Sequence, residues 1–220
     1  MSSFVLKILA CFFMLVDHIG YCLFPNVSLL RTVGRLAFPI FAFQIALGYQ
    51  KTRSKKNYFL RMLVFAMISE IPFLIFRYVS GYSTLAFNIG FTFVLALGAL
   101  YFIELSKSKN ILFSILIIPL LLIAYYLNVD YKWYGIIIVM IFYLFDLKKP
   151  FGFTAALITF ILSTAVYIYG FNASSIQMYA VISIFILGFF NNKKGRDFKY
   201  FFYIFYPAHM LLLSFIKCIM

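Results

Sequence analysis

The sequence has very little acid and little charge of any kind. Asp and Glu together supply 6 of 220 residues, and all charged residues make up 11%, whereas 65% of the chain is hydrophobic. A soluble fold of this length has too few polar side chains to shield that apolar excess from water, so a soluble protein is excluded. The sequence instead predicts an integral membrane protein.

Cysteine and histidine are also scarce. The cysteines Cys11, Cys22 and Cys218 lie in apolar segments without a C-x-x-C spacing, so they predict neither a disulfide framework nor a redox compartment. Of the two histidines, only His18 stands at helical spacing from another ligand type, Cys22, so we expect no metal. The net charge of +13 comes from short clusters between apolar runs, which argues against a nucleic-acid partner.

Long apolar runs fill most of the chain. A bilayer-spanning helix needs roughly 20 such residues, and a lone strand would leave backbone groups unpaired in lipid. We therefore predict an all-α bundle of about nine transmembrane helices, and one transmembrane domain over 1–220 because the connections are too short for a soluble module. The first run lacks a small-residue cleavage site and is expected to be retained. The predicted spans are 4–24, 33–50, 58–79, 85–105, 110–127, 132–146, 151–169, 176–190 and 199–219.

Basic residues occupy every second connection between these runs. They are Lys51, Arg53, Lys55 and Lys56, then Lys107 and Lys109, then Lys148 and Lys149, then Lys193, Lys194, Arg196 and Lys199. Positive charge marks cytoplasmic loops of membrane proteins. We therefore predict a multi-pass protein of the plasma or inner membrane, with its N-terminus in the cytoplasm and its C-terminus outside.

Polar residues inside or beside the spans gather in the half opposite these basic loops. A charge near the bilayer centre costs at least ~2.5–3.5 kcal/mol, so each one needs a partner, a cavity or a function. We expect a polar cavity toward the outside, with a substrate-facing set made of Glu70, Asn88, Asp130, Tyr131, Gln177 and Tyr206.

Asp17 and His18 are neighbours on one predicted helix, so their side chains point about 100° apart. Asp17 is better placed to pair with Arg35 across the first helix contact. His18 shares a helix face with Lys7, Cys11, Met14 and Cys22. It is either a hydrogen-bonded core histidine or a functional group, and intramembrane placement favours the second.

His209 follows Pro207, which removes a backbone hydrogen bond to Tyr203 and can kink the helix beside the imidazole. A packed histidine at a kink and a site residue are both consistent with this pattern.

The motifs Met14-Leu15-Val16-Asp17-His18-Ile19-Gly20, Gly34-Arg35-Leu36-Ala37-Phe38-Pro39-Ile40-Phe41 and Phe202 to His209 give the chain a family likeness. Together they resemble the TraX family over nearly the whole chain. TraX proteins are associated with N-terminal acetylation of conjugative pilin. They are similar, distantly, to transmembrane acyltransferases of the acyltransferase family 3 and heparan-glucosaminide acetyltransferase type. The resemblance implies acyl transfer with His18 as the base.

The expected function is therefore an acyltransferase that carries an acyl group, acetyl above all, from cytoplasmic acyl-CoA to an amine or hydroxyl at the outer face. The acceptor would be a peptide or pilin N-terminus, another protein or a surface glycan. The expected catalytic residues are His18, Asp17, Arg35 and His209, with Arg35 or Tyr206 stabilising the oxyanion. Acyl-CoA phosphates would meet Lys51, Arg53, Lys55, Lys56, Lys193, Lys194 and Arg196.

Other interpretations remain open. Positive charge that only sets topology explains the basic loops without coenzyme A. A proton-coupled small-molecule transporter would use Asp17, Glu70 and the histidines as a relay. A non-catalytic subunit of a surface-polymer assembly system would use none of them. The oligomeric state is not predicted.

Overall fold

The computed structural model describes residues 1–196 and 199–220, and the side chains of 1–196 and 201–220. Within these residues there is no β-strand, only an isolated bridge between Phe87 and Val129. The helices are α1 (Ser3–Cys22), α2 (Ser28–Gly34), α3 (Ala37–Lys51), α4 (Lys55–Val79), α5 (Ile89–Ser108), η1 (Ile111–Leu116), α6 (Ile117–Tyr126), α7 (Lys132–Leu144), α8 (Pro150–Ala165), η2 (Val166–Gly170), η3 (Ser175–Ile182), α9 (Ser183–Gly188) and α10 (Lys199–Ile219). The predicted all-α class is confirmed.

Six helical segments of the described chain are long and apolar enough to cross a bilayer: Ser3–Cys22, Ser28–Lys51, Lys55–Val79, Ile89–Ser108, Pro150–Gly170 and Phe201–Ile219. Three shorter apolar segments, Ile111–Tyr126, Lys132–Leu144 and Ser175–Gly188, match the other predicted runs. The chain is thus a helical membrane protein, while full crossing by the three shorter segments stays a prediction.

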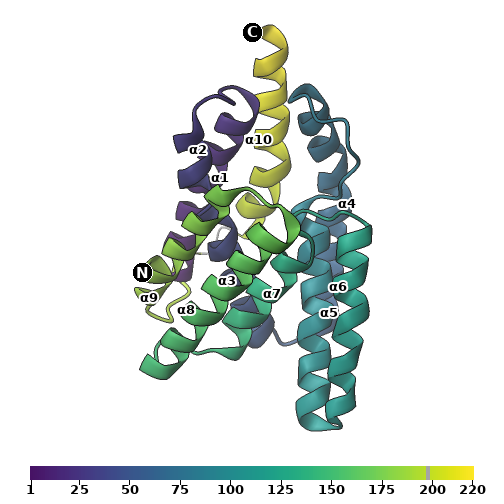
Figure 1. Cartoon of the computed structure of the whole chain (residues 1–220), viewed down its shortest axis with the longest axis vertical. Helices are drawn as coiled ribbons and strands as arrows, with labels where there is room; N and C mark the ends of the chain where they lie inside the picture. Colours follow the sequence, from purple (N-terminus) through teal and green to yellow (C-terminus); the bar gives the residue numbers. More distant parts are fainter. Residues whose placement is uncertain (197–198) are drawn as a thin grey trace.

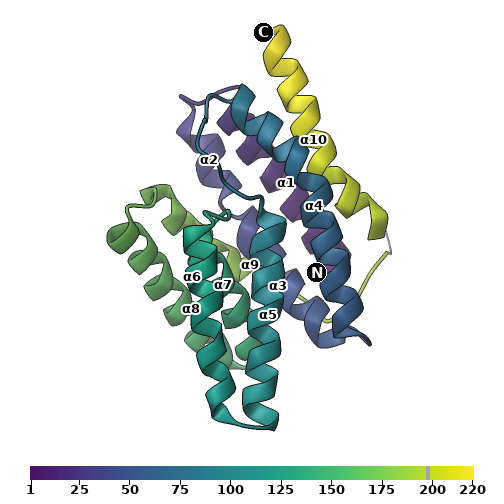
Figure 2. The same ribbon diagram turned by 90° about the vertical axis from the view of Figure 1, so that its right-hand side faces the viewer.

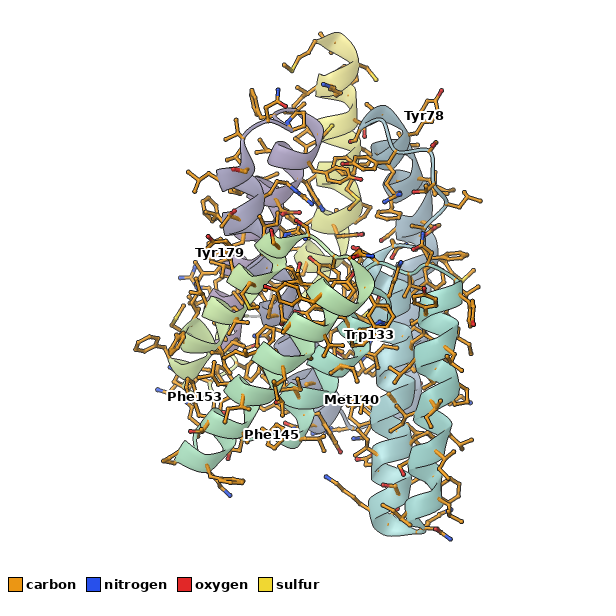
Figure 3. All side chains as sticks on the ribbon, viewed as in Figure 1. Tyr78, Trp133, Met140, Phe145, Phe153 and Tyr179 are labelled. Atoms are coloured by element: carbon orange, nitrogen blue, oxygen red, sulfur yellow. The ribbon has the colours of Figure 1, made fainter. Side chains whose placement is uncertain are left out.

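Large apolar side chains cover the outside of the bundle. On α4, for example, Ile68 and Ile71 are 63% and 68% exposed. Aromatic side chains such as Tyr78 and Tyr179 also project from the bundle (Figure 3). Such a surface is stable only in contact with lipid, because in water a very large apolar area would be exposed to solvent.

The helices pack in two groups. Helix α10 lies against α1 and α4, while α3 and α5 pack on α7, which is followed by α8 and α9 (Figures 1 and 2). Each group has its own cluster of buried side chains, a large one built around α3, α5 and α7 and a smaller one between α1, α4 and α10. The α5 and α6 hairpin extends beyond the other helices at one end (Figure 1).

The basic connections meet the N-terminal segment at one end of the bundle, here called the basic end. The contacts that bring them together are Ser3 N–H to Lys193 O at 2.8 Å, Phe4 N–H to Lys194 O at 3.1 Å, Lys51 Nζ to Asn192 O at 3.5 Å and Lys148 Nζ to Gly188 O at 3.0 Å. Lys107 also lies over the Tyr143 ring. The C-terminus lies at the opposite end (Figure 1).

Candidate functional site

A cavity of about 730 Å³ runs along most of α1. Its lining begins with Ser3 and Lys7 at the basic end and continues past His18 to Tyr21. Tyr21 lies 18 positions after Ser3 on this helix, which corresponds to about 27 Å at 1.5 Å per residue, close to the thickness of a hydrocarbon core. The volume is in the range of small-molecule sites, about 300–1,000 Å³. The cavity therefore connects the basic end with the polar residues of the other half.

The lining changes in character along this path. Lys7, Lys51 and Lys194 line the basic end. The middle is mainly apolar. Its lining includes Phe41, Ile45, Leu47, Met62, Phe65 and Phe93, with Tyr203 and Tyr206 packed on Phe65. The far end, here called the polar end, is lined by Asp17, His18, Tyr21, Arg31, Arg35, Arg77, Asp130 and Tyr131. Side chains of both buried clusters contribute, so the cavity lies between the two helix groups.

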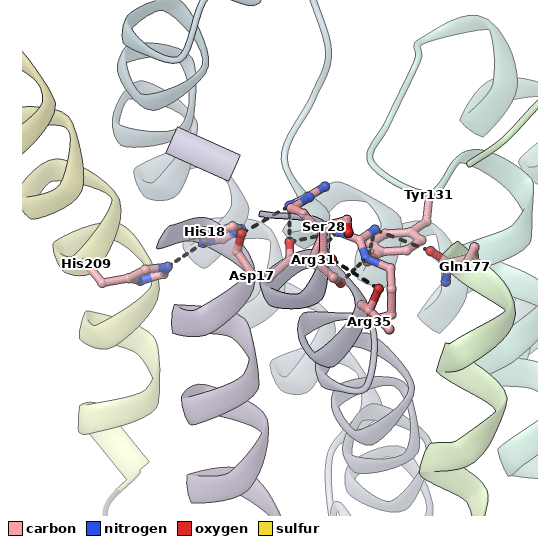
Figure 4. A network of polar contacts seen from close by, with 9 residues as sticks. Asp17, His18, Ser28, Arg31, Arg35, Tyr131, Gln177 and His209 are labelled. Atoms are coloured by element: carbon pink, nitrogen blue, oxygen red, sulfur yellow. Dashed lines mark hydrogen bonds and ion pairs between the residues drawn. The ribbon is translucent and has the colours of Figure 1, made fainter. Parts of the chain in front are cut away.

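Asp17 binds two arginines at the polar end (Figure 4). Its carboxylate accepts from Arg35 Nη2 at 2.6 and 2.8 Å and from Arg31 Nη1 at 2.5 Å. Only 11% of the Asp17 side chain and 12% of the Arg35 side chain are exposed. The predicted Asp17–Arg35 pair is confirmed. Arg31 was not predicted as a site residue, although its spacing of four residues from Arg35 would place both on one helix face.

Gly34 makes this pairing possible. A Cβ at position 34 would lie 2.2 Å from Asp17 Cβ and 2.4 Å from Asp17 Oδ1, far inside van der Waals contact. The end of α2 therefore approaches α1 closely enough for both arginines to reach one carboxylate only because residue 34 has no side chain.

Arg35 has a second, looser set of partners. Its Nη1 donates to Tyr131 Oη at 3.4 Å and to Gln177 Oε1 at 3.3 Å, and Gln177 Nε2 lies 3.5 Å from Tyr134 Oη. These distances are long for hydrogen bonds, so one face of the guanidinium is only weakly engaged. Tyr131 lines the cavity, whereas Gln177 stands behind Arg35 and does not.

The two histidines, 191 positions apart in sequence, are in direct contact (Figure 4). His18 Nδ1 lies 2.6 Å from His209 Nε2, and the ring planes are within 6° of each other. His209 Nδ1 lies 2.7 Å from the carbonyl oxygen of Phe205. His18 lines the cavity, while His209 is 5% exposed and lies behind it. Sequence reasoning singled out each histidine but did not predict their contact.

Asp130 presents a carboxylate to the cavity from the loop before α7. Its backbone is fixed on both sides: its N–H donates to Phe87 O at 2.9 Å, and its carbonyl accepts from Thr92 Oγ1 at 2.5 Å. Within the described residues its carboxylate accepts no hydrogen bond, although Asp17, Glu70, Glu104 and Asp146 each have such a partner. Burial raises the pKa of Asp130 to about 6, opposed by the positive charges of Arg35, Arg77 and Arg31 and reinforced by Asp17.

Glu70 and Asn88 do not line the cavity. Asn88 Nδ2 donates to Glu70 Oε2 at 2.6 Å and to Ala66 O at 2.7 Å, and Asn88 Oδ1 caps α5 at Gly90 N. The pair joins α4 to α5, and this contact accounts for two of the expected substrate-facing residues in structural terms. Tyr206 does line the cavity and is buried.

The expected coenzyme A set divides in two. Lys51 and Lys194 line the basic end of the cavity, joined by Lys7, which the expected set omitted although it shares a helix face with His18. Lys55 instead forms an ion pair with Glu104 at 3.0 Å. Arg53, Lys56, Lys193 and Arg196 are exposed and lie outside the lining.

No group of three metal-ligating side chains occurs among the residues that the structure describes. The expected helix-face neighbours of His18 are also divided. Lys7 and Met14 line the cavity with it, whereas Cys11 and Cys22 are buried elsewhere.

Comparison with known proteins gives a family match and a relative that both cover nearly the whole chain. A family model described as "TraX protein" matches residues 2–217. The chain is 28% identical over 240 aligned residues to "Probable fimbrial assembly protein FimC, serogroup H1" of Dichelobacter nodosus. This alignment covers 96% of this chain and 94% of the relative. It is 36% identical over 67 residues to "Uncharacterized protein RP591" of Rickettsia prowazekii (strain Madrid E). This alignment covers 30% of this chain and 25% of the relative. No solved structure matches the chain.

Proposed function

Because the chain belongs to the TraX family, we propose that it is a membrane-embedded acyltransferase that moves an acyl group, acetyl above all, from acyl-CoA to an amine on the other side of the membrane. The family link to pilin acetylation and the relative named as a fimbrial assembly protein support an acceptor on a pilin or another surface protein. The observation that carries the proposal is the cavity that joins three lysines at the basic end to His18 at the polar end.

The donor enters from the basic end. Acyl-CoA is made in the cytoplasm, and the positive-inside rule supports a cytoplasmic basic end and hence an outer polar end in the inner membrane. Its phosphates suit Lys7, Lys51 and Lys194, while its long, narrow arm suits the apolar middle. From Lys7 to His18 the path along α1 is about 16 Å, so only the arm and the thioester travel into the bundle.

The chemistry is centred on His18. The ring nitrogen Nε2 has no hydrogen-bond partner within the described residues, and it takes a proton from the amine as the nitrogen attacks the thioester carbonyl. A C–N bond forms, the C–S bond breaks, and the proton passes from His18 to the leaving thiolate to give free coenzyme A. Arg35 stabilises the oxyanion with the Nη1 face that is held only loosely by Tyr131 and Gln177.

Asp130 favours an amine over a hydroxyl as the acceptor. Its carboxylate is held at the cavity wall without a hydrogen-bond partner in the described chain, and an ammonium group is the natural counter-ion for it. The bound ammonium releases one proton to water at the polar end, and the neutral amine then attacks. The paired Asp17 is not available for this role, because two arginines already neutralise it.

The test is acyl transfer by the purified protein in proteoliposomes. Acetyl-CoA and a peptide with a free N-terminus are supplied, and free thiol and acetylated peptide are measured. We expect His18→Ala to lower both rates by about 10²–10⁴-fold, the usual contribution of a general base. Phe12→Ala is the matched control, because Phe12 lies on the same helix and is 56% exposed on the outside.

Equal rates for His18→Ala and Phe12→Ala would refute the role of His18. A wild-type protein that releases no coenzyme A but moves a solute along a pH gradient would identify the transporter instead.

A further inference from the structure

The direct contact between His18 and His209 indicates how His209 acts on His18. We propose that His209 is a positioning residue that holds His18 in the tautomer with the proton on Nδ1, so that Nε2 carries the lone pair that faces the cavity. The catalytic part of this inference rests on the proposed acyl transfer, whereas the tautomer itself does not.

The chain of hydrogen bonds fixes where each proton lies. The carbonyl oxygen of Phe205 can only accept, so His209 Nδ1, at 2.7 Å, must donate to it. A neutral His209 then has its lone pair on Nε2. His18 Nδ1, at 2.6 Å from that lone pair, must in turn donate its own proton. The remaining lone pair of His18 lies on Nε2.

This tautomer needs to be imposed, because the side chain of a free neutral histidine in water prefers to carry its proton on Nε2. That form would direct an N–H group at the incoming amine and leave His18 without a basic nitrogen on the cavity side. The ring planes, 6° apart with centroids 4.9 Å apart, place the two imidazoles edge to edge, which is the geometry for a linear N–H···N bond.

His209 acts through His18 and not on the substrate. It is 5% exposed, does not line the cavity and packs against the Phe205 ring at a centroid distance of 4.9 Å. When His18 Nε2 accepts the proton of the amine, the ring becomes a cation whose Nδ1–H bond to His209 becomes charge-assisted and stronger. The proton then leaves from Nε2 to the thiolate, and His209 is unchanged at the end of the cycle.

The experiment measures the tautomer directly. Protein labelled with ¹⁵N-histidine in detergent micelles gives signals from only two histidine side chains, and each His209 variant leaves His18 as the single labelled residue. We expect a protonated Nδ1 and an unprotonated Nε2 for His18 in the wild type. His209→Gln should keep this pattern, since the amide oxygen of glutamine can accept from His18 Nδ1. His209→Leu offers no acceptor, and the proton should move to Nε2.

Activity provides the second readout. The kcat for coenzyme A release should fall by about 10²–10⁴-fold in His209→Leu, with KM for acetyl-CoA unchanged, and His209→Gln should restore much of it. A wild-type His18 that carries its proton on Nε2 would overturn the inference, and so would a His209→Leu protein with the wild-type pattern. If leucine at position 209 prevents folding, the wild-type and His209→Gln spectra still decide the matter. A correct tautomer in a protein without transferase activity would refute the proposed function alone.

Discussion

Replacing Gly34 by alanine should break the Asp17 cluster without removing any polar group. The new Cβ would start 2.2 Å from Asp17 Cβ, and ordinary contact begins at 3.4 Å, so α1 and α2 must separate by about 1.2 Å. That shift would stretch the 2.6 Å contact between Arg35 Nη2 and Asp17 Oδ1 to nearly 4 Å, beyond hydrogen-bonding range. The buried carboxylate of Asp17 would then lose Arg35, which contacts both of its oxygens.

The expected magnitude follows from two effects. Overpacking of this kind costs about 1–3 kcal/mol of stability, which should appear as a drop of several degrees in the melting temperature in detergent. Misplacement of Arg35 by about 1 Å should lower the rate of coenzyme A release by roughly 10²-fold.

Gly188→Ala is the matched control for this substitution. Gly188, like Gly34, is the last residue of a short helix, but its added Cβ would meet Phe153 at an ordinary 3.5 Å. The two variants should therefore differ clearly in both stability and activity. A Gly34→Ala protein that is as stable and as active as Gly188→Ala would show that close approach of α1 and α2 is not required.

Two further predictions concern the ends of the cavity. Lys51→Ala should raise KM for acyl-CoA by about tenfold through loss of one charge-assisted hydrogen bond. Lys56→Ala, which changes an exposed lysine outside the lining, should leave this KM unchanged. Equal KM values for the two variants would refute the entry of acyl-CoA at the basic end. Burial raises the pKa of Asp130 to about 6, so its charged form is lost as pH falls through 6 and the KM for a peptide amine should rise below that pH. Asp130→Asn should show a high KM without this rise, and an identical pH profile for wild type and variant would contradict the assignment of Asp130.

The helices and the first ion pair were accessible from sequence because both depend on local spacing. Each apolar run must be long enough for lipid, and this constraint predicted the apolar helices of the described chain to within five residues at each end, although it did not separate α2 from α3. Asp17 and Arg35 could be paired because their helices are consecutive in the chain.

The rest of the site depends on distant contacts. His18 and His209 are 191 positions apart, and no periodicity reports that α10 returns to lie beside α1. Membrane depth predicted which polar residues lie in the bundle but not how they are used. Glu70 lies at a suitable depth for a substrate contact, yet its carboxylate is occupied by Asn88.

The apolar middle of the cavity has a consequence for the energy balance of the cell. A water-filled path about 27 Å long through the inner membrane would let ions run down the electrochemical gradient, at about 2.3 kcal/mol per charge for each 100 mV. Phe41, Phe65 and Phe93 line the stretch between the lysines and the polar end. This apolar lining excludes hydrated ions but accepts an uncharged thioester arm. These three aromatic side chains would thus insulate the membrane electrically, so that acyl transfer across it does not dissipate the membrane potential.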